Sequence, residues 1–324
     1  MSVIRVEGLH KRYGEGEEAV TAVEDVSFEI DSGSLVGILG PNGAGKTTVI
    51  KSILGLVIPT DGTVEIGGVD VFERPRVAYD RVGTVLEGAR NIYWRLTVRE
   101  NLNFFTRLEG KSAESHRDRH DELLDKLNLH DRADTTVNEL SRGMKQKVSL
   151  AAVLAREPDV VFLDEPTLGL DVQSSRQLRS ELQRLSETGV TVVLSSHDMD
   201  VIETLCDRVI ILDDGTVVRD GTVSSMIDGF RTEQVRLEVD CPDAARLEPS
   251  LRNRHTVTSF GDQPGLTEFE VALPSGNALR DVIGTVADSD GEVVEVETVA
   301  PDFETAFVEI TSDDGSRHSE EVQQ

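Results

Sequence analysis

The clearest chemical pattern in the sequence is a run that matches G-x-x-x-x-G-K-[ST] and ends in Gly45, Lys46 and Thr47. Glycines let backbone N–H groups turn inward around phosphate oxygens, and a helix that begins next adds its positive end. Lys46 would place a charge on the β and γ phosphates, and the Thr47 hydroxyl would ligate Mg²⁺. An ordinary glycine-rich turn is the alternative. The residues expected to contact a nucleotide are Gly40, Pro41, Asn42, Gly43, Ala44, Gly45, Lys46, Thr47 and Thr48.

Two adjacent carboxylates, Asp164 and Glu165, supply the second half of this chemistry. They follow the apolar run 160–163. A strand that ends in Asp delivers a carboxylate to the Mg²⁺ shell at the C-terminal edge of a sheet. Glu165 can orient and polarise an attacking water as a general base. A plain Asp-Glu-Pro turn is the alternative, and the presence of the upstream loop favours the functional interpretation.

These groups need elements that bring them to one edge of a sheet. Short apolar runs bounded by turn residues are typical of strands buried on both faces of a parallel sheet. Because such runs alternate with helix-like segments, we expect a doubly wound α/β fold. The expected buried strands are 35–39, 160–163 and 190–195, with helices over 46–54 and 174–187 and a helical region over 97–155. Residues 3–6 and 20–30 are expected to be strands, and residues 60–71 a small antiparallel hairpin.

Charge is the unusual feature of the composition. The 324 residues include 60 acidic and 33 basic side chains, for a net charge of −27. A field of this sign should repel a nucleic-acid backbone, so we expect no nucleic-acid partner. Two cysteines without a CxxC pair fit a reducing interior. Neither an apolar run of membrane-spanning length nor a secretory signal is found, so a soluble intracellular protein is expected.

We interpret the charge as an adaptation to salt. Like charges oppose compaction unless ions screen them, and the screening length falls from about 10 Å at 0.1 M salt to about 3 Å at 1 M. Only seven basic residues are lysines, and no lysine follows Lys147. The hypothesis is a halophile's cytoplasm of molar salt. An acidic protein from ordinary salt is the alternative.

A third pattern, LSRGMKQ over residues 140–146, narrows the class. Ser141 stands where a helix N-cap is expected, and taken alone the run is a capped helix. With the loop and the carboxylates in this order, residues 3–228 resemble an ATP-binding cassette (ABC) ATPase, in which this run is the signature motif. The resemblance implies that Ser141 and Gly143 bind the γ-phosphate of ATP held on a partner subunit's loop. It therefore also implies a homodimer that encloses two ATP.

Three further positions match that family. Tyr13 lies where an aromatic ring stacks on adenine, Asp171 belongs to a segment that resembles the D-loop at the dimer interface, and His197 matches the switch histidine that contacts γ-phosphate. Outside this context the tyrosine would be an ordinary surface residue. The histidine would more often be a structural cap or a core residue.

Two features depart from the commonest family pattern. The signature has Arg142 and Met144 where Gly and Gln are commonest, a variant that resembles the subgroup serving ABC-2-type exporters. No glutamine occurs in 82–102, where the family's Q-loop belongs, and Glu87 takes its place. We hypothesise that Glu87 keeps a metal-proximal role, since its oxygens also suit Mg²⁺. Trp94, with residues 91–93, is expected to contact the transporter subunit, and a buried tryptophan is the alternative.

His116 and His120 are spaced i, i+4, which permits a zinc site on a helix. Their neighbours are charged throughout, so a solvated helix face is the preferred interpretation.

The composition changes near residue 230. Residues 231–324 contain 21 acidic residues and seven arginines, with strand-like stretches around a possible helix. The expected domains are an ABC ATP-binding domain over 1–228 and a small α+β accessory domain over 231–311. Residues 312–324, almost without apolar side chains, are expected to be a disordered tail. The segment 300–311 resembles the closing segment of ATPase subunits paired with ABC-2-type permeases.

The predicted fold class is α/β: a P-loop NTPase of the ABC type with an antiparallel β subdomain, a helical subdomain and a small C-terminal α+β domain. The resemblance implies ATP and Mg²⁺ as cofactors, Glu165 and His197 as catalytic residues, and Thr47, Asp164 and Glu87 as metal ligands. It implies a second copy and an integral ABC-2-type permease as partners, with the protein peripheral on the cytoplasmic face of the cell membrane. A soluble ABC ATPase of translation or repair, without a permease, is the alternative.

Overall fold

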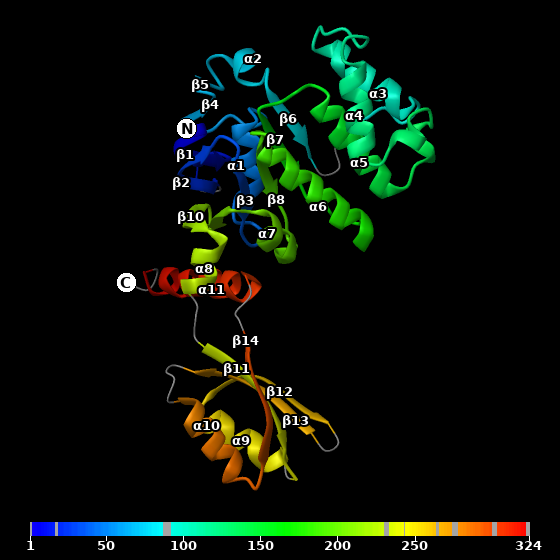
Figure 1. The fold of residues 1–324 in the computed structure, drawn as a ribbon. Coiled ribbons are helices and arrows are strands. Elements are labelled where there is room, and N and C mark those ends of the chain that lie inside the picture. Colours follow the sequence, from blue (N-terminus) through cyan, green and yellow to red (C-terminus); the bar gives the residue numbers. More distant parts are fainter. Residues whose placement is uncertain are drawn as a thin grey trace. The chain divides into compact units, whose positions relative to one another are not determined.

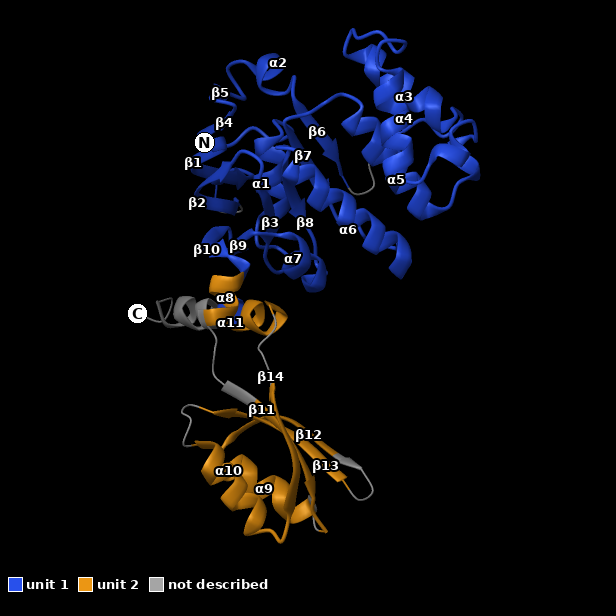
Figure 2. Ribbon diagram, in the orientation of Figure 1, with its two compact units in different colours: residues 1–223, 310–324 blue, residues 224–309 orange. Residues whose placement is uncertain are grey.

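The computed structural model describes residues 2–16, 19–86, 92–229, 233–242, 244–263, 266–273, 278–299 and 303–321. The chain divides into two compact units, one of residues 1–223 with 310–324 and one of residues 224–309 (Figure 2). The first unit ends shortly before the predicted domain boundary at 228. The domain limits inferred from sequence stay predictions.

A six-stranded sheet in the order β10-β9-β3-β8-β7-β6 forms the centre of the first unit (Figure 1). Its inner pairs are parallel, as predicted, and only β10 runs antiparallel to β9. Every residue of β3 and β8 is buried, which explains why their sequences are continuously apolar. The strands are β3 (Leu35–Leu39), β6 (Val82–Val85), β7 (Val160–Asp164), β8 (Thr191–Ser195), β9 (Arg208–Asp213) and β10 (Thr216–Thr222).

A second, antiparallel sheet in the order β2-β1-β4-β5 lies beside the first. Its inward side chains join those of β3 and β7 in one hydrophobic core, so the two sheets share their interior. This confirms the predicted antiparallel β subdomain. The strands are β1 (Ser2–Tyr13), β2 (Val20–Asp31), β4 (Asp61–Ile66) and β5 (Val69–Asp70), followed by the short helix α2 (Pro75–Ala78).

The helices of the first unit fall into two groups. One group packs on the six-stranded sheet, and the other forms the predicted helical subdomain (Figure 1). The helix α3 begins with a capping box between Thr97 and Glu100, a reciprocal pair that satisfies two backbone donors. The first group is α1 (Lys46–Ile53), α6 (Val172–Glu187) and α7 (Met199–Leu205); the second is α3 (Val98–Leu108), α4 (Arg117–Lys126), α5 (Arg142–Leu154) and the 3₁₀ turns His130–Arg132 and Val137–Glu139.

The preferred interpretation of the His116–His120 pair is wrong for His120, which is only 1% exposed. Its Nε2 lies 2.8 Å from Thr106 Oγ1. Leu123 and Leu124, three and four residues on, are buried with it, so α4 turns this face to the core and its charges outward. Burial lowers the pKa of His120, which favours the neutral ring. Within the described residues no group of three or more His, Cys, Asp or Glu side chains is arranged to hold a metal ion.

The second unit follows the chain order βαββαβ, and its sheet order is β12-β13-β11-β14. Each neighbouring pair is antiparallel. Apolar residues of α9 and α10 pack on one face of the sheet (Figure 1), which gives the split βαβ arrangement and confirms a small α+β fold. The elements are β11 (Glu233–Asp240), α9 (Ala244–Arg254), β12 (Thr256–Gln263), β13 (Leu266–Leu273), α10 (Ala278–Ala287) and β14 (Glu292–Val299).

The helix α8 (Val223–Gly229) precedes β11 in the sequence, and α11 (Phe303–Glu321) follows β14. The backbone of α11 is helical through 321, which differs from the disordered tail expected after residue 311. Within the described residues every helix falls short of the length and apolar character that a membrane span requires.

Candidate functional site

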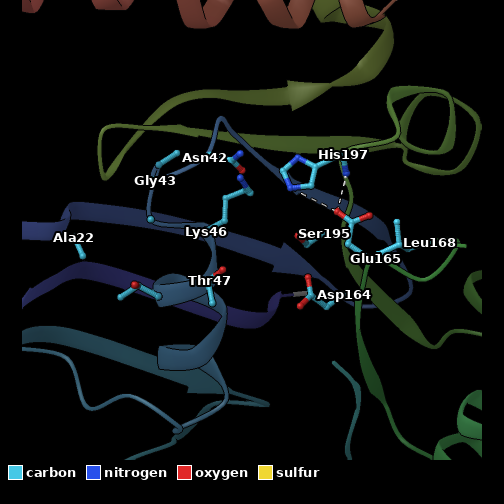
Figure 3. Close-up of a pocket in the computed structure, with 13 residues that line it drawn as sticks. Ala22, Asn42, Gly43, Lys46, Thr47, Asp164, Glu165, Leu168, Ser195 and His197 are labelled. Atoms are coloured by element: carbon cyan, nitrogen blue, oxygen red, sulfur yellow. Dashed lines mark hydrogen bonds and ion pairs between the residues drawn. The ribbon is translucent and has the colours of Figure 1, made fainter. Parts of the chain in front are cut away.

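A cavity of about 440 Å³ lies where the carboxyl ends of β3, β7 and β8 meet the first turn of α1 (Figure 3). Parallel strands end at the same edge of a sheet, so the residues that follow them converge there. The lining residues are Ala22, Asn42, Gly43, Ala44, Gly45, Lys46, Thr47, Thr48, Asp164, Glu165, Leu168, Ser195 and His197. The structure thus brings together most of the loop, both carboxylates and the histidine that the sequence singles out.

Glycine is required at the loop positions where the backbone lies against its neighbours. Gly45 has a φ of +91°, and a Cβ added there would lie 2.5 Å from the carbonyl oxygen of Ala22. A Cβ on Gly40, with a φ of +152°, would overlap the carbonyl oxygen of Leu212. Only glycine combines these dihedral angles with the absence of a side chain. The loop is therefore shaped by close backbone packing, and within it the N–H of Ala44 donates to Pro41 O at 3.3 Å.

Lys46 crosses the loop that precedes it. Its Nζ donates to the carbonyl oxygens of Gly40, at 2.5 Å, and Pro41, at 2.8 Å. Burial lowers the pKa of Lys46, while the charges of Glu165 and Asp164 act in the opposite direction. The ammonium group is thus held in the cavity by neutral carbonyls, and it can exchange them for anionic oxygens, which bind a cation more strongly.

Glu165, directly after β7, is positioned by the residues at and just after the end of the neighbouring strand β8. It has a φ of +47°, unusual for a residue with a side chain, and its backbone N–H donates to Ser195 O at 2.8 Å. Its carboxylate accepts from the backbone N–H of His197, at 2.9 Å, and from Ser196 Oγ, at 3.2 Å. Its side chain is 10% exposed. The carboxylate is therefore fixed and largely removed from water.

This environment sets the chemistry of Glu165. Burial raises its pKa, and the positive charge available on His197 together with the two hydrogen bonds opposes that rise. His197 Nε2 lies 3.8 Å from Glu165 Oε1, and the imidazole is 60% exposed on the cavity side (Figure 3). A carboxylate whose pKa is raised toward neutrality is a better proton acceptor for water. The pair can supply a base and, next to it, a donor for an anion.

Asp164 and Thr47 provide oxygen atoms on the same cavity (Figure 3). One carboxylate and one hydroxyl are the hard ligands that Mg²⁺ takes from proteins, usually completed by water and phosphate. The donor set therefore fits this ion. Glu87, the third expected ligand, lies outside the described residues.

The other predicted residues do not line this cavity. Ser141 caps α5 by accepting from Met144 N at 3.3 Å, as its N-cap position predicts. Asp171 caps α6 in the same way through Ser174 N at 2.8 Å, and these hydrogen bonds lower its pKa. Tyr13 is exposed, with Lys11 Nζ 5.0 Å from its ring centroid. Any joint action with the cavity must therefore come from a second copy or a movement.

Trp94 is 47% exposed, so the alternative of a buried tryptophan is wrong. Lys145 Nζ lies 5.3 Å from the centroid of its ring, a cation–π distance. Tyr93, beside it, is also exposed, although its ring packs edge-on against Phe104 at 4.5 Å. Together they give the helical subdomain an exposed aromatic pair.

The sequence interpretation missed four residues of the site. Ala22 and Leu168 are apolar wall residues without a chemical signal. Ser195 and Ser196 fix Glu165 through a carbonyl and a hydroxyl. The sequence does place them between the apolar run 190–194 and the histidine, but it does not show that they bond to Glu165.

Comparison with known proteins agrees with this geometry. A model of the ABC transporter family matches residues 23–168. The ABC transporter ATP-binding protein NatA of Bacillus subtilis is 36% identical over 233 residues, 72% of this chain and 95% of that protein. The Nod factor export ATP-binding protein I of Burkholderia orbicola is 39% identical over 253 residues, 78% of this chain and 81% of that protein. A solved dimeric ATP-binding cassette, in a post-hydrolysis state with ADP and Pi, superposes with a TM-score of 0.60 at 32% identity, covering 68% of this chain and 98% of that one.

Proposed function

Because this chain belongs to the ATP-binding proteins of ABC transporters, which are ATPases, we propose that two copies hydrolyse two ATP and so power a separate membrane permease of the ABC-2 export type. The observation that carries the proposal is the cavity that joins the loop 40–47 to Asp164, Glu165 and His197. The export direction is supported by the name of one relative, the Nod factor export ATP-binding protein I, of which 81% is matched.

The triphosphate is held by the loop. Its backbone N–H groups and the start of α1 face phosphate oxygens, and Lys46 exchanges the carbonyls of Gly40 and Pro41 for the β and γ phosphates. Thr48 and the other loop residues complete the cradle. Adenine stacks on the exposed ring of Tyr13.

Mg²⁺ would be held by Thr47 and Asp164, with Glu87 close to it. When bound, the ion neutralises charge on the phosphates and orients them for in-line attack. The cavity supplies the oxygen donors on the side opposite His197 (Figure 3).

Glu165 acts as the general base. Its carboxylate takes a proton from the water that attacks the γ-phosphorus, while the bond to the bridging oxygen of ADP breaks. The hydrogen bonds from His197 N and Ser196 Oγ keep the carboxylate directed at that water. The exposed imidazole of His197 donates a hydrogen bond to a γ-phosphate oxygen while negative charge on the phosphate is redistributed during the reaction.

The second copy completes each site. Ser141 and Gly143 at the start of α5 face the γ-phosphate bound to the other copy, where backbone N–H groups of a helix N-terminus favour an anion. Asp171 lies at the interface between copies. The exposed Trp94 contacts the permease, which places the protein on the cytoplasmic face of the membrane.

The test of the catalytic assignment is Glu165→Gln. The amide keeps the shape of the side chain but cannot accept the proton, so ATP binding should persist while turnover falls by about 10²- to 10⁴-fold. The matched control is Glu187→Gln, on the exposed end of α6, which should leave both unchanged. Binding of a fluorescent ATP analogue and phosphate release are the measurements. Undiminished turnover in Glu165→Gln would refute the role of this carboxylate.

The test of the transport assignment is purification from native membranes. An integral membrane protein should co-purify in stoichiometric amount. Recovery with ribosomes or nucleic acid in its place would favour a soluble ABC factor.

We also propose that the protein works in a cytoplasm of molar salt, as the net charge of −27 supports. Screening of surface repulsion should then raise stability and turnover between about 50 mM and about 1 M KCl. Full folding and activity at the lower concentration would contradict the proposal.

A further inference from the structure

The first turns of α5 and α6 pack against each other, and the loop before α6 leads back to the catalytic carboxylate. Ser141 and Asp171 cap the two helices. Gly143 is buried in this seam, and a Cβ added to it would touch Ser174 Oγ at 3.3 Å. The signature run and the loop 165–171 of one chain are therefore neighbours, independently of any second copy.

Arg142, in the first turn of α5, contacts the loop 165–171 at Gly169. A Cβ added to Gly169 would lie 2.5 Å from Nη1 and 2.6 Å from Cζ of Arg142, so the guanidinium covers the backbone of this glycine. Gly169 has a φ of +71°. Among the residues that the structure describes, Arg142 forms no ion pair with a carboxylate. Its interaction in this chain is thus the packing of a planar group on a residue without a side chain.

Two successive hydrogen-bonded turns connect Gly169 to Glu165. Leu170 N donates to Thr167 O, and Leu168 N donates to Glu165 O, each at 3.1 Å. Thr167 is buried, and Leu168 lines the cavity. A displacement of Gly169 therefore changes the turn that begins at the carboxylate-bearing residue.

The helices themselves do not depend on Arg142. One turn further along the seam, the buried Lys147 donates to Gln177 Oε1 at 2.6 Å, which joins α5 to α6. Burial lowers the pKa of Lys147, and the charges of Asp171 and Glu181 oppose this. Loss of the Arg142 side chain should thus free the loop and leave the helix packing in place.

We propose that Arg142 is a positioning residue for hydrolysis, which holds the loop 167–170 through Gly169 and so fixes the carboxylate of Glu165. The inference rests on the proposed function. It predicts a larger effect on the chemical step than on nucleotide affinity, because Lys46 and the loop 40–45 lie outside the seam. A signature with glycine in place of Arg142, the commonest family pattern, cannot make this contact.

The first experiment compares Arg142→Gln, Arg142→Lys and the control Arg132→Gln, which alters an exposed arginine of the helical subdomain. Arg142→Gln should lower kcat about tenfold and change KM for ATP less than about twofold. Arg142→Lys should be equally slow, because an ammonium group cannot cover a peptide plane as guanidinium does. The control should be unchanged. A normal kcat in Arg142→Gln, or full rescue by lysine, would overturn the inference.

The second experiment is a double-mutant cycle with Gly169→Ala. Its backbone strain is present in both backgrounds and cancels, while the overlap with Arg142 exists only in the wild-type background. We expect the double variant to be no slower than the slower single variant. Additive losses in kcat would overturn the inference. Thermal unfolding shows whether the Gly169→Ala variant folds. If it does not fold, the kcat values of the Arg142 single variants test the inference.

Failure of the inference can be distinguished from failure of the proposed function. The latter would appear in the parent protein, as absent ATP turnover, or in Glu165→Gln, as undiminished turnover. Neither outcome depends on Arg142.

Discussion

The two units of the chain use charged side chains in opposite ways. In the first, Lys46, Asp164 and Glu165 face a cavity, and the lysine is held by carbonyls. In the second, Arg236 lies on the exposed face of the sheet among carboxylates. Its guanidinium is 2.7 Å from Glu270, and Glu268 and Glu297 are also within ion-pair distance. The cavity of the first unit leaves its charges available to a ligand, whereas the sheet face around Arg236 pairs its charges within the chain.

Strand direction explains the difference. The carboxyl ends of parallel strands share an edge, so residues that follow β3, β7 and β8 must meet there. In an antiparallel sheet successive ends alternate, and polar side chains meet their neighbours across the strands. Arg236 pairs in this way with Glu270 and Glu297, directly opposite on β13 and β14. The parallel sheet thus brings polar side chains together at one edge, and the antiparallel sheet lets oppositely charged side chains pair across its strands.

The strongest way to break this comparison is Lys46→Ala. Loss of the ammonium removes the charge that faces phosphate, and kcat/KM for ATP should fall on the order of 10³-fold. Phosphate release at several ATP concentrations measures the effect. Arg236→Ala is the matched control, because it also removes one cationic side chain. It should leave the rate of ATP turnover unchanged. An equal loss in both variants would mean that the two units are not functionally distinct.

The second prediction concerns Leu237, which is fully buried in the core of the second unit. Leu237→Ala leaves a cavity and should reduce the unfolding free energy of that unit by about 3 kcal/mol. ATP affinity should stay at the parent value, as measured with a fluorescent analogue. Loss of ATP binding would show that the second unit supports the nucleotide site.

The third prediction uses the raised pKa of Glu165. A general base works in its ionised form, so kcat should fall as the pH falls through a pKa above the ordinary range of glutamate. At the pH equal to that pKa, kcat should be halved. The pH profile of Glu187→Gln should keep this acidic limb. A limb at the ordinary glutamate pKa in the parent protein would show that burial does not tune the base.

The smallest effect is expected for Arg236→Gln. Exposed ion pairs are screened by salt, so the thermal midpoint should drop slightly at low ionic strength and not in molar KCl. Differential scanning calorimetry at the two salt concentrations measures this. A large loss that persists at high salt would show that Arg236 has a structural role beyond its ion pairs.

The sequence could predict the cavity because its chemistry is local. The glycines, Lys46 and Thr47 lie in one run, and Asp164 ends an apolar strand, so residue type and spacing carry the information. The hydrogen bonds that orient Glu165 come from Ser196 and His197, which directly follow the neighbouring strand β8. Such bonds depend on which strands are neighbours, and no local pattern encodes that.

Burial was harder to predict than chemistry. His120 stands among charges in the sequence, yet it shares a helix face with Leu123 and Leu124 and is buried. The order of strands in the second unit was also unpredictable, because its alternating apolar residues define a face and not a neighbour. The covering of Gly169 by Arg142 appears only when α5 and α6 are packed.

The contact of Lys46 with Gly40 and Pro41 has a consequence for the kinetics of association. The loop is already ordered around its own lysine, so an incoming anion exchanges one set of acceptors for another and orders little new chain. Preorganisation of this kind lowers the conformational entropy lost on binding. We therefore expect the rate of association to be set by diffusion against the negative field of the protein. It should rise with ionic strength, the reverse of what a basic site would show for the same anion.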